Sequence, residues 1–334
     1  MPPAQRLSPL MKSWIVTAND PHPVLSESPK PDPAAGQILV RVAACGLNFA
    51  DLLMLEGRYQ DTPARPYVPG LEFAGEVAGF GTGVTAQSTG LKLGQPVAAF
   101  GGQGGLAQFA CLPVARVLPL PHSMTMAQAA GFQIAYGTSH LALRRAALCP
   151  GETLVVTGAS GGVGLTAVEL GKRLGARVIA IARGQAKQEV ARAAGADETL
   201  DSDMPDLRGA LKSCGGVDVI YDAVGGDLFD PCLRALRPEG RYLVIGFASG
   251  SIPKFPANLL LVKNISVIGF YWGGYLAFRP AALAQSLAEL LALHEQSPLR
   301  LHISHQLPFE AFPEGLDLLK TRRATGKVVI NLPQ

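Results

Sequence analysis

The sequence predicts an α/β protein with two domains, an antiparallel β domain and a doubly wound parallel sheet. The chain has 334 residues, and at roughly 150 residues per domain this length indicates two domains. Up to about residue 127, short apolar runs are broken by Gly and Pro, whereas beyond it strand-like segments alternate with amphipathic helices. Hydrophobic residues make up 48% and charged residues 16%, which is typical of a compact globular chain.

Residues 11–127 are expected to form the first domain. Apolar runs at residues 37–48, 69–81 and 94–102 have strand length and are separated by turn formers, which favours an antiparallel, barrel-like arrangement. Residues 1–10 are interpreted as an N-terminal extension, because strand-like sequence begins only near Met11.

Residues 128–272 are expected to form the second domain. A strand at 153–159, a helix at 163–175 and a strand at 176–182 begin an alternation that ends with a strand at 264–272. Such βαβ units have right-handed crossovers and build a parallel sheet with helices on both faces.

Charge and cysteine content exclude several classes of protein. The net charge is only +3 and no basic block is present, so we expect no nucleic-acid partner. The five cysteines are widely spaced and odd in number, which favours free thiols in a reducing compartment. We found neither a signal-peptide pattern nor about 18 uninterrupted apolar residues, so we expect a cytoplasmic protein without membrane insertion.

A glycine-rich turn between the first strand and helix of the second domain predicts dinucleotide binding. Gly162, Gly164 and Ala167 match the G-x-G-x-x-G/A pattern, in which the backbone approaches a pyrophosphate at a helix N-terminus. The alternative is that these glycines only form a turn. The turn residues expected to bind the cofactor are Gly158, Ser160, Gly161, Gly162, Val163 and Gly164.

The end of the next strand favours NADP(H) over NAD. An acidic residue would hold the 2′-hydroxyl of NAD, but this strand is followed by Arg183 and Lys187. A guanidinium binds a 2′-phosphate in bidentate fashion. The alternative for both residues is a solvated helix start.

Four motifs occur in order: GLNFADLLMLEGRYQ, PYVPGLEFAGEVAGFG, TGASGGVG and RRATGKVVI. Together they resemble the medium-chain dehydrogenase/reductase superfamily and, within it, the zinc-independent NADPH:quinone oxidoreductases. The resemblance implies a GroES-like β-barrel catalytic domain of residues 11–127 together with 273–334, and a Rossmann domain of residues 128–272. It also implies an active-site cleft between them and a homodimer joined through the Rossmann sheet edges.

The zinc ligands of related dehydrogenases are missing from these motifs. Asn48 stands where the zinc-dependent branch has a cysteine, Leu71 stands where it has a histidine, and no cluster of cysteines exists, so we expect no metal. Alcohol oxidation needs a Lewis acid, whereas a quinone or α,β-unsaturated carbonyl can accept hydride with hydrogen-bond donors and a proton source. We therefore expect NADPH-dependent reduction of such a substrate.

The resemblance also implies the site residues. Asn48, Asp51 and Tyr59 are the expected catalytic residues, as amide donor, orienting carboxyl and phenolic proton donor. The alternative is that Asn48 and Asp51 close turns and that Tyr59 only caps the cleft. The expected cofactor contacts outside the turn are Arg183, Lys187, Thr138, Asp222, Val224, Gly246, Phe247, Ser249 and Arg322.

Several assignments stay open. His140 is expected to be a packing residue rather than a substrate contact, and Arg323 and Lys327 are interpreted as a solvated helix end. The aromatic segment 270–278 lines either an acceptor pocket or a subunit interface. Two other functions also remain: an enoyl-thioester (acyl-CoA type) reductase of the same superfamily, and a non-catalytic NADPH-sensing protein.

Overall fold

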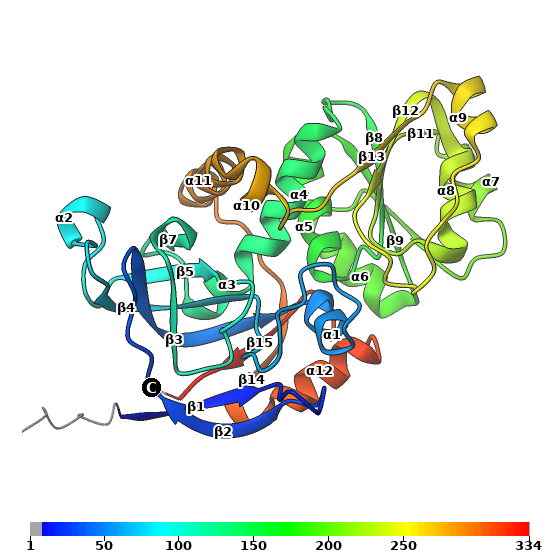
Figure 1. The fold of residues 1–334 in the computed structure, drawn as a ribbon. Helices are drawn as coiled ribbons and strands as arrows, with labels where there is room; N and C mark the ends of the chain where they lie inside the picture. Colours follow the sequence, from blue (N-terminus) through cyan, green and yellow to red (C-terminus); the bar gives the residue numbers. More distant parts are fainter. Residues whose placement is uncertain (1–8, 334) are drawn as a thin grey trace, which may run out of the picture. The chain divides into compact units, whose positions relative to one another are not determined.

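The computed structural model describes residues 9–333, so most of the expected extension, residues 1–8, lies outside the described residues. The chain forms two compact units. Unit 1 runs to Gln133 and resumes at Ile303, and unit 2 spans Ile134–His302. Each is described separately, with the elements labelled as in Figure 1.

Unit 1 is built on a largely antiparallel sheet. Its strand order is β14-β15-β3-β4-β5-β7, β6 also pairs with β3, and β1 and β2 form a separate hairpin. The strands are β1 (Leu10–Ile15), β2 (Val24–Pro29), β3 (Gln37–Leu47), β4 (Glu72–Phe80), β5 (Pro96–Phe100), β6 (Phe109–Pro113), β7 (Val117–Pro119), β14 (Ile303–Pro308) and β15 (Lys327–Asn331). The helices are α1 (Phe49–Leu55), α2 (Ala86–Thr89), α3 (Met126–Ala130) and α12 (Phe312–Lys320), with 3-10 turns at Val114–Arg116 and Phe309–Ala311.

The C-terminal strand closes this unit. β15 pairs antiparallel with β3, with Val328 opposite Leu47, and Figure 1 shows the two strands side by side. Trp14 of β1 fixes the same region, because its indole N–H donates to the Phe309 carbonyl (3.0 Å) and its ring packs edge-on against Phe312. Segments from opposite ends of the sequence thus share one apolar core.

Unit 2 is a six-stranded sheet in the order β10-β9-β8-β11-β12-β13, and all its pairs are parallel. This is the order of a doubly wound fold, so the predicted α/β class is confirmed. The strands are β8 (Thr153–Thr157), β9 (Arg177–Ala182), β10 (Glu198–Asp201), β11 (Val217–Asp222), β12 (Leu236–Val244) and β13 (Ser266–Gly269). The helices are α4 (Phe132–Arg145), α5 (Gly162–Arg173), α6 (Gln185–Ala193), α7 (Leu207–Ser213), α8 (Phe229–Ala235), α9 (Ala257–Lys263), α10 (Tyr275–Phe278) and α11 (Pro280–Gln296), with a 3-10 turn at Gly226–Leu228.

Residues 273–302 differ from the expected domain assignment, because they belong to unit 2 and not to the β domain. α11 packs on α4: His140 Nδ1 lies 2.8 Å from Ser286 Oγ, and Arg144 donates to Glu289 (2.5 Å). The segment after α11 is held as well, since Arg173 of α5 donates to the Ser297 carbonyl (3.1 Å). The amphipathic sequence pattern shows that one face of α11 must pack against apolar residues. It does not show which domain provides those residues.

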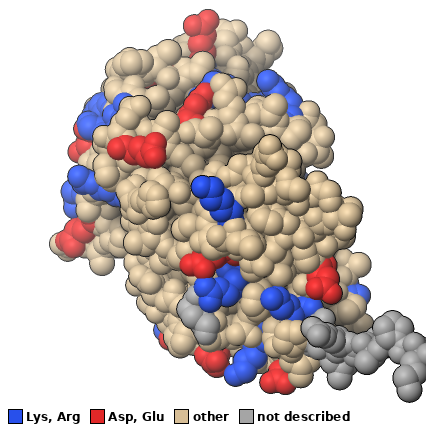
Figure 2. Space-filling model, turned by 90° about the vertical axis from the view of Figure 1, so that its left-hand side faces the viewer, with Lys and Arg blue, Asp and Glu red and all other residues tan. Residues whose placement is uncertain are grey.

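The surface charges and the apolarity of the helices can be described directly. On the face shown in Figure 2, acidic and basic side chains are interspersed and form no extended basic patch. Among residues 9–333, none of the helices combines the length and apolarity needed to cross a bilayer.

Candidate functional site

The glycine-rich turn of unit 2 lies between β8 and α5. Gly158 has φ of +61°, and a Cβ on Gly164 would lie 2.2 Å from the Gly158 carbonyl O, so neither position suits a side chain. No side chain caps α5, and the N–H groups of its first turn have no acceptor within the helix. The turn therefore presents backbone donors at a helix N-terminus, as a pyrophosphate requires. It contains the predicted residues Gly158, Ser160, Gly161, Gly162, Val163 and Gly164.

A second pair of loops meets at the same sheet edge, after β11 and β12. The Ser249 N–H donates to the Val224 carbonyl (3.0 Å), and a Cβ on Gly158 would lie 2.9 Å from Val224 Cγ2. The strand order reverses between β8 and β11, and ligands of doubly wound sheets bind at such a switch point. The structure thus groups the predicted Val224, Gly246, Phe247 and Ser249 at one end of the sheet.

Asp222 ends β11 and shapes this edge. One carboxylate oxygen accepts from Thr157 Oγ1 (2.5 Å) and from the N–H groups of Val224 (2.9 Å) and Gly225 (3.0 Å). The other accepts from the Tyr242 hydroxyl (2.7 Å), and the side chain is buried. The carboxylate is engaged by four protein donors, so its contribution is to hold the loop that follows the strand.

The end of β9 presents Arg183, whose side chain is 62% exposed and pairs with Asp203 at 3.1 Å. Asp201 accepts the Gly184 N–H (2.9 Å) and the Gln188 amide (3.0 Å), which fixes the turn into α6. An exposed ion pair of this kind contributes little to stability, so the guanidinium is available to a stronger anion. Lys187, one turn into α6, is half-buried.

Thr138 lies on α4 close to the glycine-rich turn. Its neighbour Ser139 has its hydroxyl 2.9 Å from the Val163 carbonyl and 2.8 Å from Thr166 Oγ1. Ser139 is also within 3.0 Å of the Tyr221 hydroxyl of β11. These contacts bind α4 to the first turn of α5, so buried Thr138 is held beside the turn.

The polar cluster of unit 1 consists of Asn48, Asp51, Glu72 and Lys327. Asn48 precedes α1, and its amide donates to the Gly46 carbonyl (3.2 Å) and to Glu72 Oε1 (3.1 Å). Lys327 Nζ donates to Asn48 Oδ1 (2.7 Å), Glu72 Oε1 (2.8 Å) and the carbonyl of Leu47 (2.8 Å). Strand pairing brings these groups together, because β3 lies between β4 and β15.

Lys327 corrects one expectation, and its partner Glu72 is a residue of the cluster that the sequence motifs did not indicate. Lys327 is not part of a solvated helix end: it opens β15 with its side chain 2% exposed, and its partner Glu72 is 0% exposed. Arg323, in contrast, is exposed and pairs with Asp317, as a solvated position should. The signal that marks Lys327 is its place as the first residue of an apolar strand, where a charge needs a partner.

Asp51 occupies the first turn of α1. Its Oδ2 accepts the Asn48 N–H (2.8 Å), and the side chain is buried. Burial raises the pKa of the Asp51 carboxyl to about 6, although the Asn48 N–H and the Lys327 ammonium act in the opposite direction. Asn48 and Asp51 are therefore brought together, as the shared motif indicated.

Two further predicted residues of unit 1 are Tyr59 and Arg322. Tyr59 is half-buried in the loop after α1, and its carbonyl accepts from Thr62 Oγ1 (2.7 Å). Arg322 follows α12 with φ of +58°, a left-handed backbone conformation that is uncommon for a residue with a side chain. It is exposed, in a turn where its N–H donates to the Leu319 carbonyl.

His140 and the aromatic segment 270–278 are mainly packing groups of unit 2. Burial lowers the pKa of His140, which contacts Ser286 of α11. Trp272 and Tyr275 are buried, and a Cβ on Gly137 would lie 2.4 Å from the Trp272 indole nitrogen. Phe278 is 63% exposed at the end of the segment.

The donor set in this chain does not fit a zinc ion. Glu72 already holds the Lys327 ammonium, and Leu71 beside it offers no lone pair. Burial raises the pKa of the Cys45 thiol, which donates to the Glu72 carbonyl and stays protonated. In the described part of the chain, no three His, Cys, Asp or Glu side chains are grouped to hold a metal.

Comparison with known proteins agrees with both units. Residues 34–122 match the alcohol dehydrogenase GroES-like domain, and residues 162–291 match the family described as zinc-binding dehydrogenase. These matches define an oxidoreductase with a GroES-like domain and a Rossmann-type sheet. The quinone oxidoreductase-like protein 2 homolog of Nematostella vectensis is 38% identical over 304 residues, covering 89% of this chain and 82% of that protein.

Solved structures extend the likeness to the whole chain. The quinone oxidoreductase of Thermus thermophilus, also solved with NADPH, has a TM-score of 0.84 and 31% identity, covering 96% of this chain and 100% of that one. The Escherichia coli quinone oxidoreductase complexed with NADPH has a TM-score of 0.85 and 26% identity, covering 96% and 99%. The chain belongs to the quinone oxidoreductase family of the medium-chain dehydrogenase/reductase superfamily.

Proposed function

We propose that this protein uses NADPH to reduce a quinone or another α,β-unsaturated carbonyl compound without a metal ion. The observation that carries the proposal is the presence in one chain of the Gly158–Gly164 turn and of a polar cluster in which the Lys327 ammonium pairs with Glu72. Two solved relatives were obtained with NADPH, and Arg183 offers this chain a guanidinium for the 2′-phosphate.

The cofactor, when bound, supplies a hydride. The turn between β8 and α5 would hold its pyrophosphate, Arg183 and Lys187 its 2′-phosphate, and the loops at Val224 and Gly246–Ser249 its nicotinamide end. Arg322 and Thr138 are proposed as further cofactor contacts. Asp222 is proposed to act on binding only through the loop that it holds.

Asn48 is proposed to donate a hydrogen bond to the substrate carbonyl. Its longer contact, 3.2 Å to the Gly46 carbonyl, is the one that a substrate oxygen would replace. Lys327 strengthens that donor, because an ammonium on the amide oxygen polarises the whole amide. As hydride arrives at the conjugated acceptor, negative charge develops on its oxygen, and this polarised donor stabilises it.

Tyr59 is proposed to deliver the proton that completes the reduction, directly or through a water molecule. The Tyr59 hydroxyl would transfer its proton to the carbon or oxygen that carries the negative charge after hydride addition, and the resulting phenolate would take a proton from solvent. Asp51 orients the start of α1 by accepting the Asn48 N–H. It is a positioning residue in this proposal.

The test is the loss of NADPH absorbance with a simple quinone, a simple enone and an enoyl thioester, each with a chelator present. We expect turnover of the quinone or the enone that the chelator does not abolish. Preference for the thioester would favour the acyl-thioester reductase alternative. Tight NADPH binding with no turnover across a broad panel of acceptors would contradict the proposal and favour a sensor.

We also propose a homodimer in which the β13 edges of two Rossmann sheets meet. β13 is the edge strand of its sheet, and most of its residues are exposed. The unpaired backbone groups of an exposed edge strand can pair with another strand. Val267 on this strand is 38% exposed. Light scattering should give twice the mass of 35.0 kDa, and Val267→Lys should shift it toward one chain; a monomeric wild type would refute the dimer.

A cytoplasmic location is proposed on chemical grounds. All five cysteines are free thiols, including exposed Cys149, and a reducing compartment keeps them so. Fractionation of the source cells, with the protein found outside the cytoplasm, would contradict this location.

A further inference from the structure

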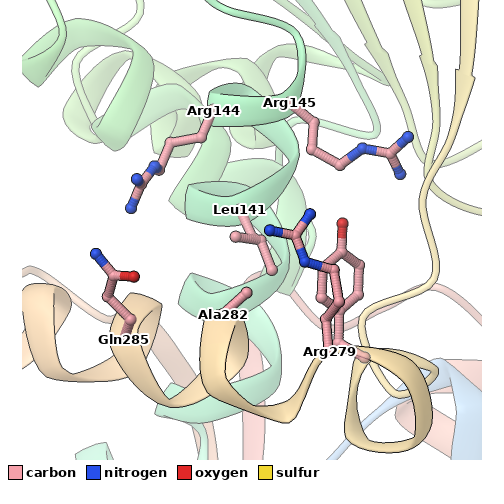
Figure 3. Close-up of a pocket in the computed structure, with 7 residues that line it drawn as sticks. Leu141, Arg144, Arg145, Arg279, Ala282 and Gln285 are labelled. Carbon is pink, nitrogen blue, oxygen red and sulfur yellow. The ribbon is translucent and has the colours of Figure 1, made fainter.

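Unit 2 contains a cationic pocket between α4 and the start of α11, shown in Figure 3. We propose that this pocket binds a phosphate monoester dianion at a site distinct from the residues assigned to the cofactor. Its lining residues are Leu141, Arg144, Arg145, Tyr275, Arg279, Ala282 and Gln285. None of them belongs to the expected cofactor set, so the proposal does not depend on the proposed reductase activity.

Three guanidinium groups come to this pocket from two helices. Arg144 and Arg145 are the last two residues of α4, and Arg279 precedes α11. In Figure 3, the Arg279 side chain extends from the start of α11 toward α4, and Arg144 reaches toward Gln285. Arg145 extends to the opposite side of α4 from Arg144, and the Arg279 guanidinium lies between them, where its fork-shaped donor can meet an anion.

The positive charge of the pocket is only partly balanced. Arg144 donates to Glu289 (2.5 Å), and Gln285 donates to the same carboxylate (2.9 Å). Among the residues that the structure describes, Arg145 donates only to the neutral Gly269 carbonyl (2.9 Å). The Arg279 side chain makes neither an ion pair nor a hydrogen bond within residues 9–333.

Neighbouring titratable groups leave this imbalance in place at neutral pH. His140 lies 3.7 Å from Glu289, and burial lowers its pKa, so the ring is neutral and adds no charge. The sequence from Asn264 to Ala288 contains no Asp or Glu. Arg145 and Arg279 are exposed, so the pocket keeps two solvated guanidinium charges without a carboxylate partner, and both are accessible to an anion.

The shape and lining indicate the class of anion. The cavity volume is about 190 Å³, below the range for drug-sized ligands, so it suits a phosphate group with a small substituent. Leu141, Ala282 and the ring of Tyr275 form an apolar wall for that substituent. The first turn of α11, a helix of 17 residues, adds partial positive charge beside Ala282.

The test is a calorimetric titration of the full chain with inorganic phosphate and, separately, with phenyl phosphate, each with and without NADP⁺. We expect saturable binding that NADP⁺ does not displace and that Arg279→Gln weakens about tenfold or more. Tighter binding of phenyl phosphate would identify an organic phosphate as the ligand, and equal binding would identify free phosphate.

The matched control is Arg208→Gln, which removes one exposed guanidinium of α7 elsewhere in unit 2. We expect it to leave both titrations unchanged. The proposal is overturned if neither probe binds saturably, if NADP⁺ displaces the probes, or if the two variants weaken binding equally.

Discussion

Lys327 is the residue that organises the polar cluster of unit 1. Its ammonium donates three hydrogen bonds, one to each of Leu47, Asn48 and Glu72. A charge at 2% exposure is stable only with such partners, because desolvation opposes burial. The amide of Asn48 and the carboxylate of Glu72 are thus held in one geometry.

Lys327→Met should destabilise the protein by about 3 kcal/mol in chemical denaturation, because it leaves the Glu72 carboxylate buried without a cation. Adding Glu72→Gln to that variant should recover part of the loss. Lys320→Met, which removes an exposed lysine at the end of α12, should change little. A loss below about 1 kcal/mol would show that the ion pair does not hold the cluster.

The raised pKa of Asp51 implies that the free energy of unfolding depends on pH. Its pKa of about 6 in the folded chain exceeds the usual 3.8, so the folded state binds more protons between these values. The free energy of unfolding of wild type, relative to Asp51→Asn, should therefore rise by up to about 3 kcal/mol as pH falls from about 7 to about 4. A difference that does not vary with pH would contradict the buried, protonated carboxyl.

The sequence predicts the site residues that contact neighbours close in sequence, and it does not predict those whose contacts join distant segments. Asn48 and Asp51 share one helix start, so their association follows from their spacing. Lys327 follows Gly326 near two arginines and has the local features of a solvated turn. Only the pairing of β15 with β3 places it beside Asn48, some 279 positions away.

At the scale of elements, the turn between β8 and α5 depends on close backbone approach. Gly164→Ala would place a methyl group 2.2 Å from the Gly158 carbonyl, so the start of α5 must move. We expect at least about a tenfold loss of NADPH affinity and destabilisation of about 1–3 kcal/mol. Fluorescence titration and denaturation measure the two effects.

Gly161→Ala is the matched control for that substitution. Its Cβ would meet the Gly158 carbonyl at 3.4 Å, an ordinary contact, so affinity should change far less. Equal effects of the two alanine variants would mean that close packing at Gly164 is not what shapes the site.

The glycine-rich turn could be predicted from the sequence, because the glycine spacing, the preceding strand and the following helix all indicate the same motif. The loops after β11 and β12 could be predicted to lie at the same edge, because the carboxyl ends of parallel strands meet there.

At the scale of the whole molecule, the chain leaves and re-enters the GroES-like unit, and residues 273–302 stay with the Rossmann sheet. Hydrophobic periodicity predicts α11 as an element but does not assign its partner, so its domain could not be predicted. The contacts of α11 with α4 decide it. The two-domain organisation could be predicted from the chain length and from the change from short apolar runs to alternating strands and helices.

Leu290→Ala tests this assignment, because Leu290 of α11 is fully buried. The cavity should destabilise unit 2 by about 2–4 kcal/mol and increase hydrogen exchange in α4 while leaving β3 unchanged. Leu291→Ala, at a half-buried position of the same helix, should have a smaller effect. Faster exchange confined to β3 would contradict the unit boundaries.

Isotope transfer from the cofactor is the decisive measurement for the proposed hydride transfer from NADPH to a conjugated carbonyl compound. The protein is incubated with NADPH deuterated at the transferable position, a simple enone and a chelator, and the saturated product is analysed by mass spectrometry and NMR. We expect one deuterium on the β-carbon of the product. A product without deuterium, or no saturated product with any conjugated acceptor, would contradict the proposed hydride transfer.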